Sequence, residues 1–584
     1  MNDRTEGVST RVAPSNDSLG RVLHYHQETK HHFSHYARSL GYLDWANQPD
    51  PFRHYEGSPR FALPRLKPDD APVSTLYEDL YCPQAVATSA IAVRSLSRLF
   101  EYALAISAWK QAGEVRWALR SNPSSGNLHP SEAYLLVDDV AGLVPGPGLY
   151  HYSSREHALE LRAHWPKASV TRLLHGFPPE AFLVGLSSVN WRETWKYGER
   201  AFRYCQHDVG HAIVGLRIAA QTLGWRMLLL DGSADETVAT LLGIDREEDF
   251  EGAEREHPDC IAALWPAHRV ADHATRKTIR VPLSLTERSV RDVAGLVWHG
   301  RANRLSRDEP VTWEILDQVT DASWKSSTEQ EDVELQCEPP PVNLSSVRPR
   351  LERPRLSAGQ VIRQRRSALA FDPAGLLSAD SFITMLSRVM PQAEVNLSWR
   401  TMPWDALPWL PAVHLALFVH RVAGWVPGLY LLARDPAAVD RLKASTHRQF
   451  DWTTPPGCPN DLPLYLLQEG DARALAAQLS CGQEIAGDGA FSVAMIAEFE
   501  PRLRQHGPWF YRRLFWETGA IGQVLYLEAE AAGVRATGIG CFFDDPVHEV
   551  MGFKDACFQS LYHFTTGTPV EDPRLTSSPP YQGD

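Results

Sequence analysis

The sequence predicts an α+β protein in which two copies of one unit pair within a single chain. Three observations favour this fold class: the length of the chain, a helical segment that occurs twice, and a strand–turn–strand segment that occurs twice. At 584 residues the chain exceeds the size of one ordinary hydrophobic core, so two or more domains are expected. We place the first unit at residues 75–300 and the second at residues 358–570.

The recurring helix carries a carboxylate near its start, a glycine two residues later and a glycine at its end. The two segments match without a gap, as Asp208-x-Gly210-x5-Leu216-x3-Ala220-x3-Gly224 and Glu517-x-Gly519-x5-Leu525-x3-Ala529-x3-Gly533. Apolar residues at three- and four-residue spacing, with a glycine at the stop, indicate a helix in both places. The internal glycines permit another backbone to approach closely, which suits a buried helix at a two-fold interface.

Upstream of each helix, two apolar runs flank a turn that contains Pro and Gly. The runs are 130–137 with 140–150 in the first unit, and 411–419 with 422–430 in the second. Each pair predicts a strand, a turn and a second strand. Because two blocks recur in the same order, we interpret the chain as a diverged duplication.

Four segments lie outside the units and differ from them in composition. Residues 1–20 are polar and predicted to be a flexible tail, whereas residues 21–74 are rich in aromatic residues and predicted to pack on the first unit. The stretch 301–357 is polar and rich in Pro and charge, which predicts a long surface linker. Residues 571–584 form a C-terminal tail.

Composition narrows the class of protein. A formal net charge of −13 disfavours nucleic acid as the main partner, because phosphate binding needs a basic face. No apolar run is long enough to span a bilayer, and the N-terminus lacks the apolar core of a secretory signal. The eight cysteines contain no Cys-x-x-Cys pair, which favours reduced thiols and gives no zinc signature. A cytoplasmic protein is therefore expected.

A turn rich in Ser, Gly and Asn precedes the strand-like run 132–137. Its candidate ligand-binding residues are Ser124, Ser125, Gly126 and Asn127. Backbone N–H groups, hydroxyls and an amide converge in such a turn, which suits a flat ligand with polar edges such as a flavin. An ordinary loop that binds nothing is the alternative.

A second candidate element lies far downstream. Arg365 and Arg366 offer permanently charged donors for a phosphate, and Ser367 adds a hydroxyl. No element of this type precedes the turn in the first unit, so the two elements together indicate one site. The alternative is the solvated basic end of a helix, since Arg pairs are common.

These residues resemble a known family. The turn 123–127, the run 195–204 and the helix 208–224 resemble the flavin-dependent nitroreductase superfamily. Within it they are most similar to the SagB/ThcOx-type dehydrogenases, which oxidise azolines to azoles in modified peptides. The second unit resembles the superfamily through 365–367, through Gly538-Ile539-Gly540 and through 560–567. The resemblance implies that each unit is a mixed sheet flanked by helices and that the units form an intrachain pseudo-dimer.

The resemblance also implies an FMN site shared between the units. In the superfamily one subunit supplies the Arg-Arg-Ser phosphate site and the glycine segment beside the flavin N5 atom, and its partner supplies the turn. Here the second unit would supply the first set and the first unit the second. The implied FMN ligands are Ser124, Ser125, Gly126, Asn127, Arg365, Arg366, Ser367, Gly538, Ile539, Gly540 and Arg574.

The reciprocal site is damaged in the sequence. Where the second unit would need the small-residue turn, 403–408 brings bulk and a carboxylate, and in the first unit 228–232 replaces Gly-Ile-Gly. We therefore expect one working FMN site and one degenerate site, in a chain that needs no second copy to pair.

Lys196 and Tyr197 are the candidate catalytic residues. They match a Lys-Tyr pair that the azoline dehydrogenases are thought to use to remove a proton as hydride leaves for the flavin. An apolar, aromatic surrounding favours the neutral amine that a lysine base needs. The second unit has Phe510-Tyr511 at the comparable place, so only the first could perform this step. A surface lysine beside a core tyrosine is the alternative.

The predicted function is a two-electron dehydrogenation of azoline-like heterocycles or related substrates in modified-peptide biosynthesis. The expected partners are a small-molecule or peptide substrate and a peptide-modifying complex, with no nucleic acid and no membrane. Two alternatives stay open: an NAD(P)H-dependent reductase of nitro compounds or quinones, and a non-catalytic flavin-binding subunit. No metal site is expected, because His207 and His211 lack the Glu of a zinc-protease helix.

Overall fold

The computed structural model describes residues 16–66, 75–82, 85–267, 278–336, 355–391, 397 and 400–581. The first fifteen residues of the predicted tail, residues 337–354 of the predicted linker and residues 582–584 lie outside the described residues.

The first unit is built on a seven-stranded sheet in the order β2-β7-β6-β5-β8-β10-β9. Neighbouring strands are antiparallel throughout. The strands are β2 (Arg60–Ala62), β5 (Ser131–Val137), β6 (Gly148–Ser153), β7 (Ala158–His164), β8 (Phe182–Ser188), β9 (Trp225–Leu229) and β10 (His257–Pro266).

The second unit is built on a six-stranded antiparallel sheet in the order β16-β15-β14-β17-β19-β18. Its strands are β14 (Val413–Val419), β15 (Gly428–Leu432), β16 (Leu464–Glu469), β17 (Phe491–Glu498), β18 (Arg535–Ile539) and β19 (Phe558–Gly567).

The two sheets share one strand order, because β7-β6-β5-β8-β10-β9 corresponds in position to β16-β15-β14-β17-β19-β18. The predicted strand–turn–strand segments are β5 with β6 and β14 with β15, so both predictions are confirmed. Between the named strands all pairing is antiparallel, and parallel pairing among the described residues consists of isolated bridges such as Ser367 with Ala536.

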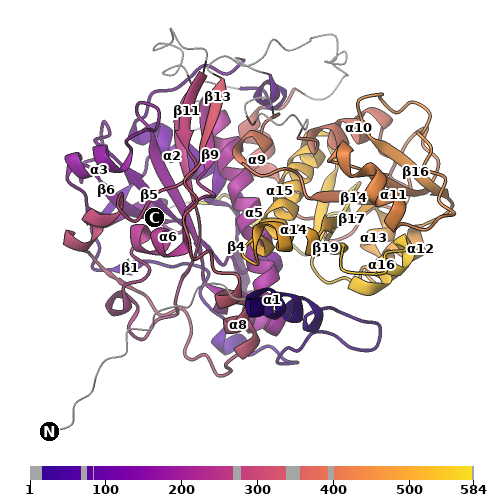
Figure 1. Cartoon of the computed structure of the whole chain (residues 1–584), viewed down its shortest axis with the longest axis horizontal. Coiled ribbons are helices and arrows are strands. Elements are labelled where there is room, and N and C mark those ends of the chain that lie inside the picture. Colours follow the sequence, from indigo (N-terminus) through magenta and orange to yellow (C-terminus); the bar gives the residue numbers. More distant parts are fainter. Residues whose placement is uncertain are drawn as a thin grey trace.

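Two long helices, α5 (Ala201–Gln221) and α15 (Phe510–Ala531), pack against each other between the sheets (Figure 1). A Cβ atom added to Gly210 would overlap the carbonyl oxygen of Trp516, and one added to Gly519 would overlap the carbonyl oxygen of His207. The two backbones are therefore in contact at these glycines, as the repeat predicts.

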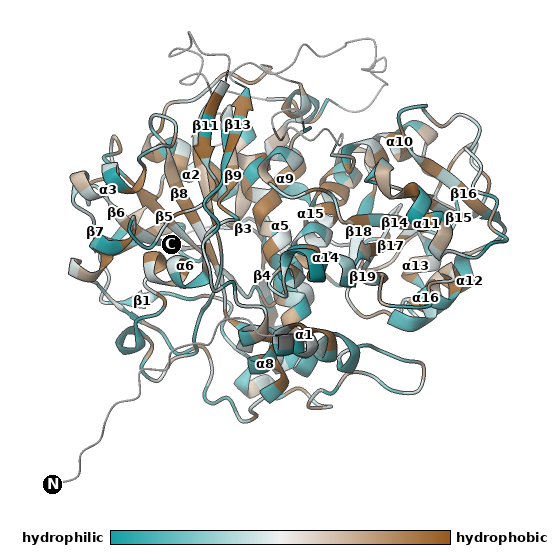
Figure 2. Cartoon of the chain, viewed as in Figure 1, coloured by the Kyte–Doolittle hydropathy of each residue, from teal (hydrophilic) through white to brown (hydrophobic). Residues whose placement is uncertain are grey.

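One hydrophobic core runs through the junction of the units. It joins residues of the first sheet, such as Leu135, through Val209 of α5 and Ile521 of α15 to residues of the second sheet, such as Leu417. Figure 2 shows apolar residues along the strands and α5, and more polar residues on the outlying helix α16 (Asp544–Met551). Helix α12 (Arg473–Leu479) packs beside α16. Because the core is continuous, we expect the two units to stabilise each other.

Shorter helices cover the outer faces of the sheets and the edges of the junction. They are α2 (Val93–Ala103), α3 (Lys167–Leu173), α4 (Asn190–Tyr197), α6 (Asp235–Leu242), α9 (Ala358–Gln364), α10 (Ala379–Arg388), α11 (Val439–Ser445), α13 (Ile485–Asp488) and α14 (Glu500–His506).

The segment predicted as a surface linker is partly folded. It contains β12 (Arg301–Ala302), α8 (Glu314–Ala322) and β13 (Asp332–Gln336), and β13 pairs with β11 (Thr278–Pro282). Helix α8 buries Leu316, Val319 and Ala322, which recur every third residue, and packs on α1 (Figure 1). The charged residues and prolines around these apolar residues led to the prediction of a linker, although the apolar spacing is that of a helix. The linker description is therefore corrected for residues 301–336.

The terminal segments are also ordered against the units. Helix α1 (Asn16–Glu28) begins inside the predicted tail, and β1 (Tyr55–Glu56) pairs with β12. The extension touches both units, because the Tyr25 hydroxyl donates to the Glu199 carbonyl and the Lys30 ammonium pairs with Asp545 at 2.6 Å. At the other end, β20 (Thr576–Ser578) pairs with β3 (Ile106–Ala112) of the first unit.

Among the described residues, no helix is both long enough and apolar enough to cross a bilayer.

Candidate functional site

The predicted turn is held in shape by its own side chains. The Asn127 amide donates to the Ala118 carbonyl of β4 (Val115–Arg120) at 2.8 Å, and its oxygen lies 3.0 Å from His129 Nε2. The Ser124 hydroxyl accepts from the His129 N–H at 2.8 Å. Gly126 and Asn127 both have left-handed backbone, with φ of +59° and +60°. The Asn127 side chain thus fixes the shape of the turn.

Lys196 and Tyr197 lie directly against the backbone of Gly126. A Cβ atom added to Gly126 would lie 2.6 Å from the Tyr197 hydroxyl and 3.0 Å from Lys196 Nζ. Both residues are half-buried at the C-terminal end of α4. The structure therefore brings the predicted turn and the predicted catalytic pair together.

Two buried carboxyl groups lie behind the turn. Asp208 accepts hydrogen bonds from the Ser125 N–H at 3.1 Å and hydroxyl at 3.2 Å, and has no cation within ion-pair distance in the described ranges. Burial raises the pKa of Asp208 to about 7, against hydrogen bonds from Ser124 and Ser125 that lower it.

Glu193 is fully buried one helical turn before Lys196. Neither of its oxygens has a hydrogen-bond partner in the part of the chain that the structure describes. Burial, and then the charge of Asp208, raise the pKa of Glu193. Burial thus disfavours a full negative charge on Glu193 beside Lys196.

A polar cavity of about 230 Å³ lies at the junction of the units. Its lining comes from both of them, as Lys110, Arg366, Ser367, Ala368, Leu369, Arg535, Val570, Glu571, Asp572, Leu575 and Ser577. Burial, then the charges of Arg366 and Arg535, lower the pKa of Lys110. Three cationic side chains therefore converge here, one from β3 of the first unit and two from the second.

The cavity also holds two carboxylates, and each forms an ion pair. Glu571 forms an ion pair with Arg535, and Asp572 forms one with Arg574 at 2.7 Å. The Arg574 side chain is 85% exposed and is not among the lining residues that the structure describes. Its predicted role as a phosphate ligand stays a prediction.

Arg365 and Arg366 have different surroundings. The buried Arg365 donates to the backbone carbonyls of Ser121 at 3.2 Å and Arg120 at 3.1 Å, across the junction. Arg366 faces the cavity and donates to the Ser107 hydroxyl of β3 at 3.2 Å. Only the second arginine of the pair lines the cavity, while the first fastens the second unit to the first.

Tyr526 connects the Ser367 end of the site to the glycine segment. Its hydroxyl lies 2.9 Å from Ser367 Oγ and accepts from the Gly538 N–H at 2.9 Å. The glycines themselves are closely covered, since a Cβ at Gly538 would overlap the Tyr562 hydroxyl and one at Gly540 would overlap the Tyr204 ring. Ile539 between them is buried.

The cavity and the turn are attached to the same hairpin of the first unit. Arg366 contacts Ser107 on β3, and Asn127 contacts Ala118 on β4. Trp109 of β3 is the register partner of Ala118. Arg366 of the second unit and Asn127 of the first therefore both contact this one hairpin.

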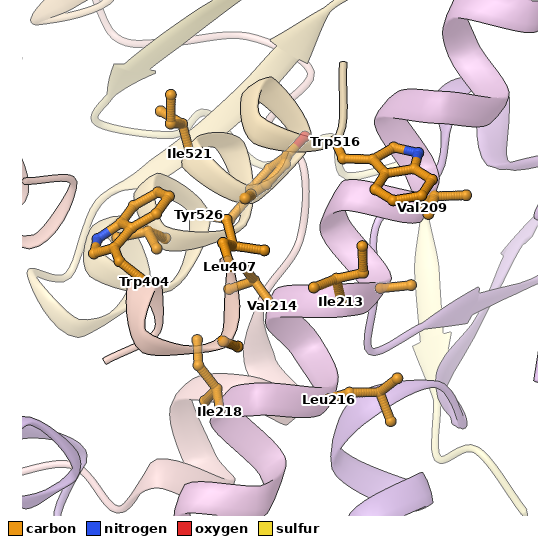
Figure 3. Close-up of a cluster of buried hydrophobic side chains, with 14 of the residues drawn as sticks. Val209, Ile213, Val214, Leu216, Ile218, Trp404, Leu407, Trp516, Ile521 and Tyr526 are labelled. Atoms are coloured by element: carbon orange, nitrogen blue, oxygen red, sulfur yellow. The ribbon is translucent and has the colours of Figure 1, made fainter. Parts of the chain in front are cut away.

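The place in the second unit that corresponds to the turn of the first unit is filled by side chains. Figure 3 shows Trp404 and Leu407 among the apolar side chains of α5 and α15. Glu517, the counterpart of Asp208 in the repeat, is ion-paired with Arg434 and accepts from the Ala412 N–H at 3.0 Å. Glu517 is thus ion-paired in the second unit, whereas its counterpart Asp208 in the first unit has no cation partner among the described residues. This difference distinguishes the two places chemically.

The histidines of α5 are packed into the junction. His207 Nδ1 lies 3.0 Å from Thr518 Oγ1, and the ring stacks on Tyr562. His211 contacts Gln523 and Tyr562. Within the described ranges, no group of three or more His, Cys, Asp or Glu residues could hold a metal ion.

Sequence reasoning missed Lys110, Arg535, Tyr526 and Glu193. Lys110 lies in a strand and Arg535 at the start of another, and neither position has a neighbouring motif. Only the antiparallel pairing of β20 with β3 and the placement of β18 bring them together. Glu193 stands three residues before Lys196, so its place on the same helix face could have been predicted.

Comparisons with known proteins agree on the fold. No protein-family model matches the chain. A Methanocaldococcus jannaschii protein described as a "putative nitroreductase" is 26% identical over 129 residues, which are 21% of this chain and 63% of that protein. The chain thus spans less than two thirds of this curated relative.

A crystal structure described as a "putative nitroreductase" from Anabaena variabilis ATCC 29413 matches with a TM-score of 0.62 and 21% identity, over 94% of this chain and 99% of that one. A chain of the E. coli microcin synthetase McbBCD complex matches 43% of this chain and 93% of its own length, with 18% identity and a TM-score of 0.25. The Anabaena match shows that this chain has a nitroreductase-like α+β fold.

Proposed function

We propose that the chain is an FMN-dependent oxidoreductase that dehydrogenates azoline-like heterocycles or related groups in modified peptides. One FMN site would be shared by both units. The observation that carries the proposal is the position of Lys196 and Tyr197 against the backbone of Gly126, in a turn that contacts the same hairpin as Arg366 of the cationic cavity.

The donor set of the cavity fits the phosphate of FMN. Lys110, Arg366 and Arg535 would hold the phosphate, because convergent guanidinium and ammonium groups are strong partners of phosphate oxygens. Ser367 would add a hydroxyl donor. When bound, FMN supplies a two-electron acceptor for hydride.

Lys196 is assigned as the base that takes the substrate proton. Burial raises the pKa of the Tyr197 phenol, so this group stays protonated and can donate a hydrogen bond but cannot act as a base near neutral pH. The Lys196 amine lies beside it and can accept a proton in its neutral form. Burial of Glu193 behind it disfavours a negative charge there.

The shared strand order of the two sheets supports the interpretation that the chain arose by duplication. The filled place around Trp404 supports a single working site.

The test is single-turnover reduction of the flavin by a peptide that contains an azoline. Lys196→Ala should slow flavin reduction by about 10²–10⁴-fold, the usual effect of removing a general base. Tyr197→Phe, which keeps the ring, should have a smaller effect. FMN content and circular dichroism should be unchanged in both. Unchanged turnover of Lys196→Ala with this substrate would remove the assignment.

Two other outcomes would replace the proposal. Rapid NAD(P)H oxidation with nitro or quinone acceptors, insensitive to Lys196→Ala, would favour a reductase. A colourless protein that refuses added FMN would favour a substrate-docking subunit.

A further inference from the structure

Two cysteines from separate segments of the second unit lie in contact. Cys481 follows α12, and Cys541 follows β18 and directly succeeds Gly540. Their sulfur atoms are 2.8 Å apart, within about 1 Å of the length of a disulfide bond. Both are free thiols and both are only half-buried, so small molecules can reach them.

Hydrogen bonds to backbone groups hold the two cysteine-bearing segments together. The Phe543 N–H donates to the Leu479 carbonyl at 2.9 Å, and the Gln483 amide donates to the Cys541 carbonyl at 3.0 Å. Cys481 itself has left-handed backbone, with φ of +56°, a conformation that favours glycine and strains a cysteine. A strained position occupied by a reactive side chain and tied to its partner segment indicates a functional pair.

The two thiols are chemically unequal. His31 Nδ1 accepts the Ala37 N–H at 2.9 Å, so the ring proton lies on Nε2 and His31 donates it to Cys541. The Cys481 thiol, then His31 and the Arg200 charge, lower the pKa of Cys541 to about 5 despite partial burial. The hydrogen bond with Cys541 raises the pKa of Cys481. Cys541 is the thiolate near neutral pH, and Cys481 is the thiol.

The charged and titratable groups around the pair come from four segments. They are His31 and Tyr36 of the N-terminal extension, Tyr197 at the end of α4, Arg200 and Tyr204 at the start of α5, and Asp544 at the start of α16. Asp544 is neutralised by ion pairs with Arg200 at 3.0 Å and Arg203 at 2.7 Å. The local field therefore favours a thiolate at Cys541.

We propose that Cys481 and Cys541 form a redox-active dithiol site that reduces low-molecular-weight disulfides. The Cys541 thiolate attacks one sulfur of the disulfide, the S–S bond breaks, and one thiolate leaves. Cys481 gives its proton to that thiolate and attacks Cys541, which closes the intrachain disulfide and releases the second thiolate. Two protein thiols are oxidised to one disulfide, and one small disulfide is reduced to two thiols. This site does not depend on the proposed flavin chemistry.

The test uses the full chain, with glutathione disulfide as the probe. After incubation, acid quenching and alkylation, peptide mass mapping should find the Cys481 and Cys541 peptides linked, and dithiothreitol should separate them. Cys481→Ser should accumulate a stable mixed disulfide on Cys541, because the resolving thiol is gone. Cys541→Ser should leave Cys481 unmodified. Cys557→Ser, which changes a half-buried cysteine elsewhere, should behave as the unchanged chain does.

A second measurement keeps the proposal testable if a variant fails to fold. In the unchanged chain, iodoacetamide should alkylate Cys541 at pH 6 at least tenfold faster than Cys557, whose pKa is raised mainly by burial. No link at any ratio of glutathione to its disulfide, or equal alkylation of Cys541 and Cys557, would overturn the proposal. A link that forms equally in Cys541→Ser would also overturn it.

Discussion

The Arg365 guanidinium of the second unit donates to the Ser121 carbonyl of the first, over 3.2 Å. Ser121 lies only a few residues before the turn that faces Lys196, and Arg365 lies beside the Arg366 that lines the cavity. One buried hydrogen bond thus joins the segment that carries the turn to the segment that carries the cationic lining. The site is therefore a property of the paired units and would be incomplete in either unit alone.

Removing the cavity arginine should weaken FMN selectively. Arg366→Ala should lower FMN affinity by about 10–100-fold, because a charge-assisted hydrogen bond contributes about 1.5–3 kcal/mol. Riboflavin, which lacks the phosphate, should bind both forms equally. Fluorescence titration measures both ligands. Arg504→Ala removes an exposed arginine at the outer helix α14 and serves as the control. Equal weakening of FMN and riboflavin would contradict a phosphate role.

The same titration tests whether Arg574 binds the phosphate of FMN. The structure pairs it with Asp572 at the surface, so Arg574→Ala should leave FMN affinity within about twofold. A loss as large as that of Arg366→Ala would show that Arg574 turns inward to the phosphate when FMN binds.

A side chain at Gly126 should displace the catalytic pair. Gly126→Ala would place a methyl group 2.6 Å from the Tyr197 hydroxyl, in addition to the strain of its left-handed backbone. Gly113→Ala is the matched control, because its φ of +58° is nearly the same and its added methyl meets nothing within 4 Å. Both should lose about 1 kcal/mol of stability from backbone strain. Only Gly126→Ala should also lose activity, and equal activity in the two variants would count against the site.

Contact between the two long helices makes the glycines there indispensable. Gly210→Ala would overlap the backbone of α15, so we expect destabilisation of more than about 3 kcal/mol or failure to fold. Gly215→Ala, on the same helix, meets its nearest atom at 3.4 Å and should change stability by no more than about 1 kcal/mol. Denaturant unfolding compares the two. Similar stabilities would contradict the close approach of α5 and α15.

The buried carboxyl of Asp208 should make stability depend on pH. The pKa of Asp208 is about 7 in the folded chain and about 3.9 in the unfolded chain. The contribution of Asp208 to the free energy of unfolding is therefore full below about pH 4 and is lost as the pH rises through about 7. Asp208→Asn removes this loss and should be more stable than the unchanged chain by a few kcal/mol at pH 8, with little difference at pH 4. Thermal unfolding at both pH values measures it.

Asp259 provides a matched control for the Asp208 substitution. Burial also raises its pKa to about 7, and it accepts from the Ser188 hydroxyl. Asp259→Asn should flatten the stability profile in the same way without altering flavin reduction. A larger gain for Asp208→Asn at pH 4 than at pH 8 would refute the account of Asp208.

Much of the fold was accessible from the sequence because it is encoded locally. The helix glycines at 210 and 519 and the paired strands β5–β6 and β14–β15 follow from short-range patterns, and the structure confirms them. The folded part of the linker was missed, since the three buried residues of α8 are surrounded by charge. Local pattern could not reveal which packing partner α8 finds.

The candidate site could be predicted from the sequence in part. The turn and the Lys196–Tyr197 pair are adjacent in space as the family resemblance implies. The sequence could not distinguish Arg365 from Arg366, because only the tertiary structure shows that Arg366 lines the cavity while Arg365 is buried against the carbonyls of Ser121 and Arg120. Lys110 and Arg535 join the cavity through strand register, which a single sequence does not encode locally.

The central claim is that each chain builds one flavin site from its two units. The most direct measurement is the amount of FMN bound per chain at saturation, determined by absorbance of the released flavin against protein concentration. We expect one FMN per chain, reduced sharply in Arg366→Ala at a concentration that saturates the unchanged protein. Two FMN per chain, or one that is retained undiminished without Arg366, would contradict the claim.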